Sequence, residues 1–139
     1  MRSIIKLSLI TLLFSGFQSP KKIVPIWFEE YGVEIFEVRP IGDTIRYNKS
    51  SEEDFKFVFY SSKGKCYCER YLNGKLSEQG YFANSLDTLR RYVAGRSLKG
   101  ERGPIRVQEY FQPLKNGEWI VYTDKVNKET YKLGVLIKR

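Results

Sequence analysis

Six basic residues lie within seventeen positions in the second half of the chain, and they form its sharpest candidate for a binding site. Only Glu101 opposes them there, which leaves a net charge of +5. Guanidinium groups pair bidentately with phosphates, sulfates and carboxylates, so the cluster predicts contact with an anionic partner that salt weakens. The alternative is a solvated segment whose charge only keeps the protein soluble. The six are Arg90, Arg91, Arg96, Lys99, Arg102 and Arg106.

The residue types argue against catalysis. The 139 residues include no His, which excludes His-containing triads and His-ligated zinc. Neighbouring carboxylates occur at Glu29-Glu30, Glu34/Glu37 and Glu52-Glu53-Asp54, but adjacency supplies neither the cleft nor the unlike pKa values that acid–base catalysis requires. Phosphate-binding loops and G-x-S-x-G elbows are also missing from the sequence. We therefore predict a protein that is not an enzyme and holds no catalytic residue, cofactor or metal.

Two cysteines, Cys66 and Cys68, stand two residues apart on a predicted strand, so both side chains should point to one face. Free cysteine is often a small buried hydrophobe, which is the first interpretation. A disulfide between them would close a very small, strained ring, and a bond to another molecule is the third possibility. Two thiolates alone fall short of a four-ligand zinc site.

The aromatic residues are numerous, with two tryptophans, Trp27 and Trp119, and ten tyrosines. Flat rings could form a platform that stacks on sugars. Rings on strands more often pair across the sheet and fill its core, and we favour that interpretation.

The elements that must position these residues are mostly strands. Hydrophobic residues alternate with polar ones in Phe55–Tyr60, Val33–Val38 and Thr44–Tyr47, which is the period of a half-buried strand. Two Asn-Gly pairs, Asn73-Gly74 and Asn116-Gly117, predict tight hairpin turns because both residues accept positive φ. We therefore expect a mainly all-β fold of antiparallel hairpins.

One segment is expected to interrupt the strands. Leu86, Leu89 and Val93 recur at helical spacing after a capping residue at Asn84 or Ser85, and Gly95 is a plausible stop. This predicts one short helix that carries Arg90 and Arg91. The glycine-rich, basic stretch from residue 96 to residue 104 should then be a loop.

Short hairpin motifs repeat along the chain. The pattern Tyr71-x-Asn73-Gly74-Lys75-Leu76-x-Glu78-x-Gly80-x-Phe82, followed by Asn116-Gly117-x-Trp119-x-x-Tyr122, resembles the bacterial variant of the MORN repeat over residues 57–82 and 114–137. The resemblance implies a MORN-like curved sheet of stacked hairpins and an interaction scaffold. The matching positions are turn glycines and stacking aromatics, so no catalytic residue is implied.

The first nineteen residues read as an export signal. Arg2 precedes the apolar run from Ile4 to Phe14, which is the layout of a secretory signal peptide and too short for a membrane-spanning helix. An N-terminal strand or buried helix is the alternative. We expect residues 1–19 to be the signal and residues 20–139 to form a single β-rich domain with no membrane span, secreted or held in the periplasm or cell envelope.

These observations favour a non-enzymatic, exported interaction protein that contacts an anionic partner through the basic segment. The partner would be a protein or an anionic component of the envelope, and export makes nucleic acid less attractive. A second hypothesis is an antitoxin- or immunity-like protein that covers one protein target with a sheet face. A small envelope enzyme is the third.

Overall fold

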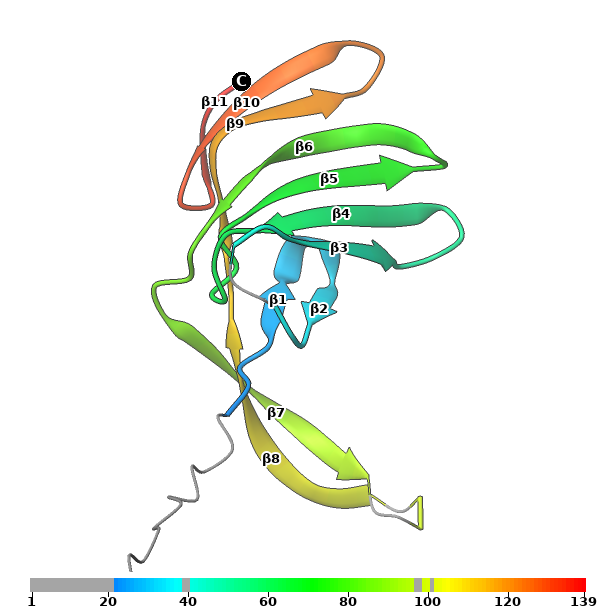
Figure 1. Ribbon diagram of the computed structural model, residues 1–139, viewed down its shortest axis with the longest axis vertical. Helices are drawn as coiled ribbons and strands as arrows, with labels where there is room; N and C mark the ends of the chain where they lie inside the picture. Colours follow the sequence, from blue (N-terminus) through cyan, green and yellow to red (C-terminus); the bar gives the residue numbers. More distant parts are fainter. Residues whose placement is uncertain (1–21, 39–40, 97–98, 101) are drawn as a thin grey trace, which may run out of the picture.

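The computed structural model describes residues 22–38, 41–96, 99–100 and 102–139. The predicted signal peptide, residues 1–19, lies outside the described residues and stays a prediction. Eleven strands and one short 3₁₀ helix make up the described chain (Figure 1). Their bounds are β1 Ile26–Phe28, η1 Glu29–Tyr31, β2 Val33–Ile35, β3 Asp43–Asn48, β4 Glu53–Phe59, β5 Cys66–Leu72, β6 Lys75–Ala83, β7 Thr88–Arg96, β8 Arg102–Phe111, β9 Leu114–Tyr122, β10 Val126–Lys132 and β11 Val135–Lys138.

The strands form two sheets. Seven strands in the order β11-β10-β9-β6-β5-β4-β3 make an antiparallel sheet, which we call the body. The second sheet has the order β2-β1-β8-β7, and its single parallel contact joins β1 to β8 at Ile26 and Phe111. The prediction of a mainly all-β fold of antiparallel hairpins is confirmed.

The core lies between the inner face of the body and the segment β1-η1-β2. Phe55, Phe57 and Phe59 alternate with half-buried residues along β4, so all three rings point inward and are buried. Phe28, at the end of β1, stacks on Phe57 with ring centroids 4.6 Å apart and meets Phe82 edge-on at 4.9 Å. Truncating such a ring to alanine costs about 3–5 kcal/mol, so these contacts hold the short N-terminal strands on the sheet.

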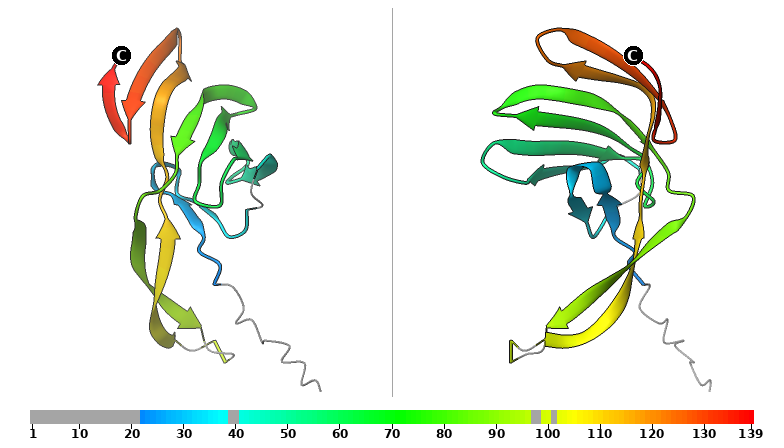
Figure 2. Two further views of the ribbon diagram at one scale, coloured as in Figure 1. Left: turned by 60° about the vertical axis from the view of Figure 1, so that its left-hand side comes forward. Right: turned by 180° about the vertical axis from the view of Figure 1, so that it is seen from behind.

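The strands β7 and β8 form a long hairpin that extends away from the body, and we call it the arm (Figures 1 and 2). The predicted short helix is wrong, because Thr88–Arg96 is strand β7. The predicted basic loop over residues 96–104 is wrong at both ends, since Arg96 belongs to β7 and residues 102–104 belong to β8, whereas Lys99 and Gly100 do lie in the connection between the strands. Pairing with β8 decides the conformation: Tyr92 lies opposite Val107 and Val93 opposite Arg106, and these aromatic and β-branched residues suit a strand better than a helix.

The two Asn-Gly pairs have different roles. Asn73 and Gly74 form the two-residue turn between β5 and β6, with φ of 50° and 74° as a type I′ turn requires. Asn116-Gly117 is not a hairpin turn, so that prediction is wrong: both residues lie within β9. There the pairing register with β6 shifts, and Gly117 has a φ of 78°. This bulge lays the indole of Trp119 over Gly80, whose missing Cβ would stand 2.3 Å from the ring.

The last two strands, β10 and β11, are joined by a turn at Leu133-Gly134, where φ is 47° and 83°. Asn116 stabilises this turn, because its Oδ1 accepts a 3.2 Å hydrogen bond from the Leu133 amide. The Asn116 side chain therefore serves a turn, but a different one from the turn that the sequence predicts.

Candidate functional site

The arm gathers the basic segment onto one hairpin. Arg90, Arg91 and Arg96 lie on β7, Arg102 and Arg106 lie on β8, and Lys99 is exposed in the connection between the two strands. The register places Arg90 opposite Glu109 and Arg96 opposite Arg102. Strand pairing thus concentrates the positive charge along an element that projects into solvent (Figure 2).

One face of the arm carries an exposed apolar group next to the Arg90–Glu109 ion pair. Tyr92 is 82% exposed, and Ile105 and Val107 of β8 are 74% and 51% exposed. The register puts Tyr92 directly opposite Val107, and Ile105 opposite Ala94. We call these four residues the apolar stripe of the arm. Scattered apolar residues on a surface are ordinary, but this contiguous group is the kind that marks contact surfaces.

The other face of the arm carries Arg91 and Arg106 and is anchored at its base. The Arg91 guanidinium lies 4.7 Å from the ring centroid of Trp27 in β1 and 5.9 Å from that of Tyr110 in β8. Stacking of this kind contributes about 0.5–1 kcal/mol at an exposed site and leaves the edge N–H groups of the guanidinium accessible. Arg91 thus positions the arm and remains available to an anion.

Glu109 of β8 is the acidic residue beside Arg90, on the face of the apolar stripe. Its carboxylate pairs with Lys22 at 3.2 Å and with Arg90 at 3.4 Å. The Lys22 hydrogen bond and the two positive charges hold the pKa of Glu109 below its ordinary value. The pair with Lys22 ties the base of the arm to the chain entering β1.

A second charged cluster lies on the inner face of the body, and sequence reasoning missed it as a unit. Lys115 of β9 is buried, and its Nζ is 2.9 Å from both Glu78 Oε2 and Glu30 Oε1. Arg70 then links Glu78, at 3.1 Å, to Glu53, at 2.8 Å. The series ends at Lys49, whose Nζ lies 3.3 Å from Glu53 Oε2. We call these six residues the ion-pair chain.

Aromatic rings enclose the buried end of the ion-pair chain. The Lys115 ammonium lies 4.4 Å from the ring centroid of Trp119, 5.3 Å from Tyr131 and 5.6 Å from Tyr31. Burial, followed by the neighbouring Cys68 and Glu78, raises the pKa of Tyr31. A cavity of about 310 Å³ opens beside Lys115 and Glu30.

The ion-pair chain is arranged for anchoring rather than for reaction. Each of its charges faces an opposite charge within 3.3 Å, so Lys115 is neither a free nucleophile nor a free anion receptor. In the part of the chain that the structure describes, no cluster of three metal-ligating side chains occurs. The ion-pair chain joins η1 to β5, β6, β9 and the β3–β4 hairpin, and so it fixes the N-terminal segment on the sheet.

The carboxylates that are neighbours in the sequence have different partners in the fold. Glu30 and Glu53 belong to the ion-pair chain, and Glu29 accepts a hydrogen bond from the Gln112 side chain. Burial opposes ionisation of Glu53, but Arg70 and Lys49 outweigh it and lower the pKa of that carboxyl. Glu30 and Glu53 therefore act as structural partners of cations, and Glu29 as the partner of an amide side chain.

The two thiols, Cys66 and Cys68, are free and fully buried on the inner face of β5. Burial raises the pKa of both. Thiols that stay protonated are poor nucleophiles, so the pair functions as packing in this structure.

The large aromatic residues divide between the core and the outer face of the body. Trp119 and Tyr31 fill the core, whereas Tyr67, Tyr71 and Tyr122 lie half-buried on the outer face. There they bond to neighbouring polar side chains: Tyr71 donates to Glu69 at 2.6 Å, and Gln79 donates to Tyr122 at 2.8 Å. These hydroxyl groups are engaged within the sheet.

No helix among the described residues is long and apolar enough to cross a membrane. Comparisons with known proteins give no match: no family model, no curated protein and no solved structure is significantly similar to this chain. The function must therefore be argued from the arm and the body themselves.

Proposed function

We propose that this chain is a non-enzymatic, exported partner-binding protein whose arm contacts an acidic protein. The observation that carries the proposal is the projection of the arm, which presents the basic residues and the apolar stripe together, away from the body (Figure 1). Charge at the edge of an interface speeds association, and exposed apolar residues at its centre supply affinity.

The contrast with the body supports this assignment. The buried ammonium of Lys115 meets Glu78 and Glu30, whereas on the arm Glu109 pairs with Arg90, and Arg91 and Arg106 are exposed. An acidic partner would supply the opposing charges. The MORN-like resemblance implies an interaction scaffold, which agrees with this function, and export to the envelope remains part of the proposal.

A salt-dependent binding measurement tests the proposal. The full chain is titrated into a fluorescent, glutamate-rich peptide in low and moderate salt, and we expect binding that weakens as salt rises. The variant Arg90→Ser/Arg106→Ser should bind about three- to tenfold more weakly, because exposed charge pairs contribute about 0.2–1 kcal/mol each.

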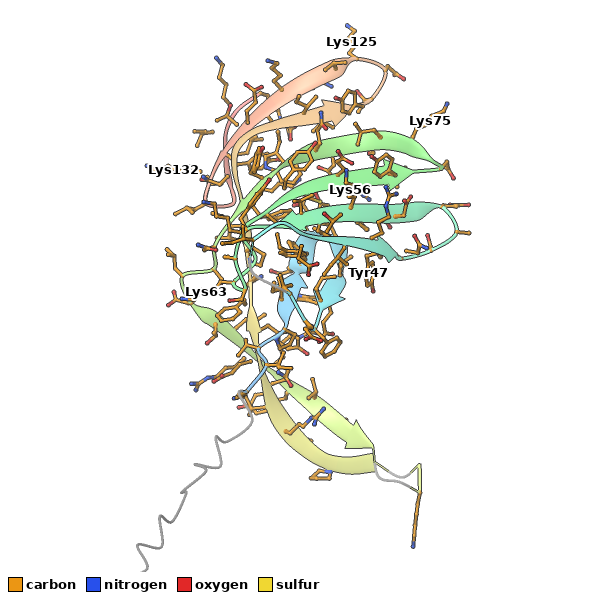
Figure 3. The ribbon with its side chains drawn as sticks, in the orientation of Figure 1. Tyr47, Lys56, Lys63, Lys75, Lys125 and Lys132 are labelled. Carbon is orange, nitrogen blue, oxygen red and sulfur yellow. The ribbon has the colours of Figure 1, made fainter. Side chains whose placement is uncertain are left out.

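The matched control removes two positive charges from the body. Figure 3 shows Lys75, Lys125 and Lys132 on the body, away from the arm. Lys75→Ser/Lys132→Ser changes the net charge by the same amount and should leave the affinity nearly unchanged. Equal losses in the two double variants would mean that total charge, rather than the arm, governs binding, and the proposal would fail.

A further inference from the structure

We propose that the free edge of β7 binds an extended segment of the acidic partner as an added β-strand in which acidic and aliphatic residues alternate. This inference rests on the proposed function, because it takes the arm as the partner-binding surface. It specifies the chemistry that the partner must have and the main-chain contacts that it makes.

The first support is the position of β7 in its sheet. β7 is the last strand in the order β2-β1-β8-β7, and within the described part of the chain it pairs with β8 alone. It is nine residues long and contains no proline. Such an edge presents a row of unpaired N–H and C=O groups, which an extended peptide can pair with.

The second support is the difference between the two faces of the arm. The side chain of Tyr92 lies on the face of the apolar stripe, whereas Arg91 and Val93 lie on the opposite face with Arg106. Side chains of an added strand alternate in the same way. Aliphatic residues of the partner would extend the apolar stripe beside Tyr92, and its acidic residues would lie beside Arg91 and Val93, on the face where Arg106 stands one strand further in.

Charge complementarity favours an acidic strand over a second copy of the chain at the free edge of β7. Two β7 edges brought together would place arginines close to arginines, and like charges on neighbouring strands are destabilising. An acidic strand instead meets complementary charge. Nucleic acid would satisfy the arginines but has no extended peptide backbone to pair with β7.

A set of nine-residue peptides tests the inference on the full chain. The first alternates glutamate and valine, the second has the same composition in two blocks, and the third is the alternating peptide with N-methyl groups on its three central residues. N-methylation removes backbone donors along both edges of the peptide while keeping its charge. We expect the alternating peptide to bind at least about tenfold more tightly than either of the others, because several backbone hydrogen bonds are lost.

Hydrogen exchange and side-chain variants locate the site. Binding of the alternating peptide should protect amides within Thr88–Arg96, the residues of β7. Tyr92→Ser/Ile105→Ser should weaken binding several-fold. Val126→Ser/Val135→Ser, which alters two residues of the body that are 65% and 64% exposed, should leave it unchanged.

The outcomes separate this inference from the proposed function. Equal binding of the N-methylated and unmodified peptides would show that the arm recognises charge without strand pairing, which overturns the inference and leaves the proposed function standing. Absence of binding by every acidic peptide would overturn both. A dimer of the free chain that Tyr92→Ser/Ile105→Ser abolishes, or binding of a single-stranded oligonucleotide that displaces the peptide and leaves β7 unprotected, would overturn the choice of partner.

Discussion

The arm and the ion-pair chain use the same residue types in opposite surroundings. On the inner face of the body, Lys115 is buried between Glu78 and Glu30 and enclosed by aromatic rings. On the arm, Arg91 stacks on Trp27 at an exposed position, and Arg106 is open to solvent. Burial makes a charge a requirement for folding, whereas exposure makes it available for binding.

Mutations in the two regions should therefore have different effects. A substitution in the ion-pair chain should alter the free energy of unfolding, and a substitution on the arm should alter binding.

The largest effect is expected at Lys115. Lys115→Met removes the ammonium and leaves the buried Glu78 with only Arg70 opposite it, so we expect a loss of about 3–5 kcal/mol in the free energy of unfolding. Urea denaturation measures it. The double variant Glu78→Leu/Lys115→Met should recover much of the loss, since it removes both buried charges, and a double variant no better than the single one would contradict this explanation.

Gly80 and Gly95 compare the packing of the two regions directly. A Cβ at Gly80 would stand 2.3 Å from the Trp119 indole, whereas one at Gly95 in the arm would stand 3.0 Å from the Pro104 carbonyl oxygen. We expect Gly80→Ala to cost up to about 3 kcal/mol, because the indole is buried and cannot move away. Gly95→Ala should cost less, since the two-stranded arm can adjust. Equal losses in urea denaturation would contradict the comparison.

Alkaline pH should destabilise the body through its thiols. Burial raises the pKa of Cys66 and Cys68, so both stay protonated in the folded state while the unfolded chain loses these protons near pH 8.5. The unfolded state then binds fewer protons, and stability falls as pH rises. We expect about 2 kcal/mol between pH 8.5 and 9.5 from the two thiols together.

Urea denaturation across that pH range gives the slope. The control is Cys66→Ala/Cys68→Ala, whose stability is lower at every pH but should depend less on it. Identical slopes for the two proteins would show that the thiols do not carry the effect. The arm's arginines do not titrate in this range, so they contribute nothing to the slope.

The smallest effect on stability is expected on the arm. Arg91→Ser removes the stacking on Trp27 and Tyr110 and should cost about 0.5–1 kcal/mol. Because the contact is local, amide exchange should quicken at the base of β7 and β8 and stay unchanged in β4 and β5. Faster exchange throughout the body would contradict the separation of the two regions.

The sequence predicts the body much better than it predicts the arm. Alternation along β4 and the Asn73-Gly74 turn depend on neighbouring residues, so both could be read directly. Leu86, Leu89 and Val93 have helical spacing, and only pairing with β8 turns this segment into a strand. Local patterns therefore failed where a partner strand decides the conformation.

The ion-pair chain could not be predicted for a similar reason. Lys115 lies 37 residues from Glu78 and 85 from Glu30 in the sequence, and each looks like an ordinary surface charge. Only the pairing of β6 with β9 and the position of η1 on the inner face bring them together. The basic segment was visible in the sequence because its residues are contiguous, although its conformation was not.

One paired measurement tests the central claim that the arm serves binding and the ion-pair chain serves folding. Affinity for the alternating acidic peptide and the free energy of unfolding are measured for Arg90→Ser/Arg106→Ser and for Lys115→Met. The arm variant should lose affinity about three- to tenfold with stability within about 0.5 kcal/mol of the parent, and the body variant should lose about 3–5 kcal/mol of stability and keep its affinity while folded. Retained affinity in the arm variant, or lost affinity in a folded body variant, would contradict the account.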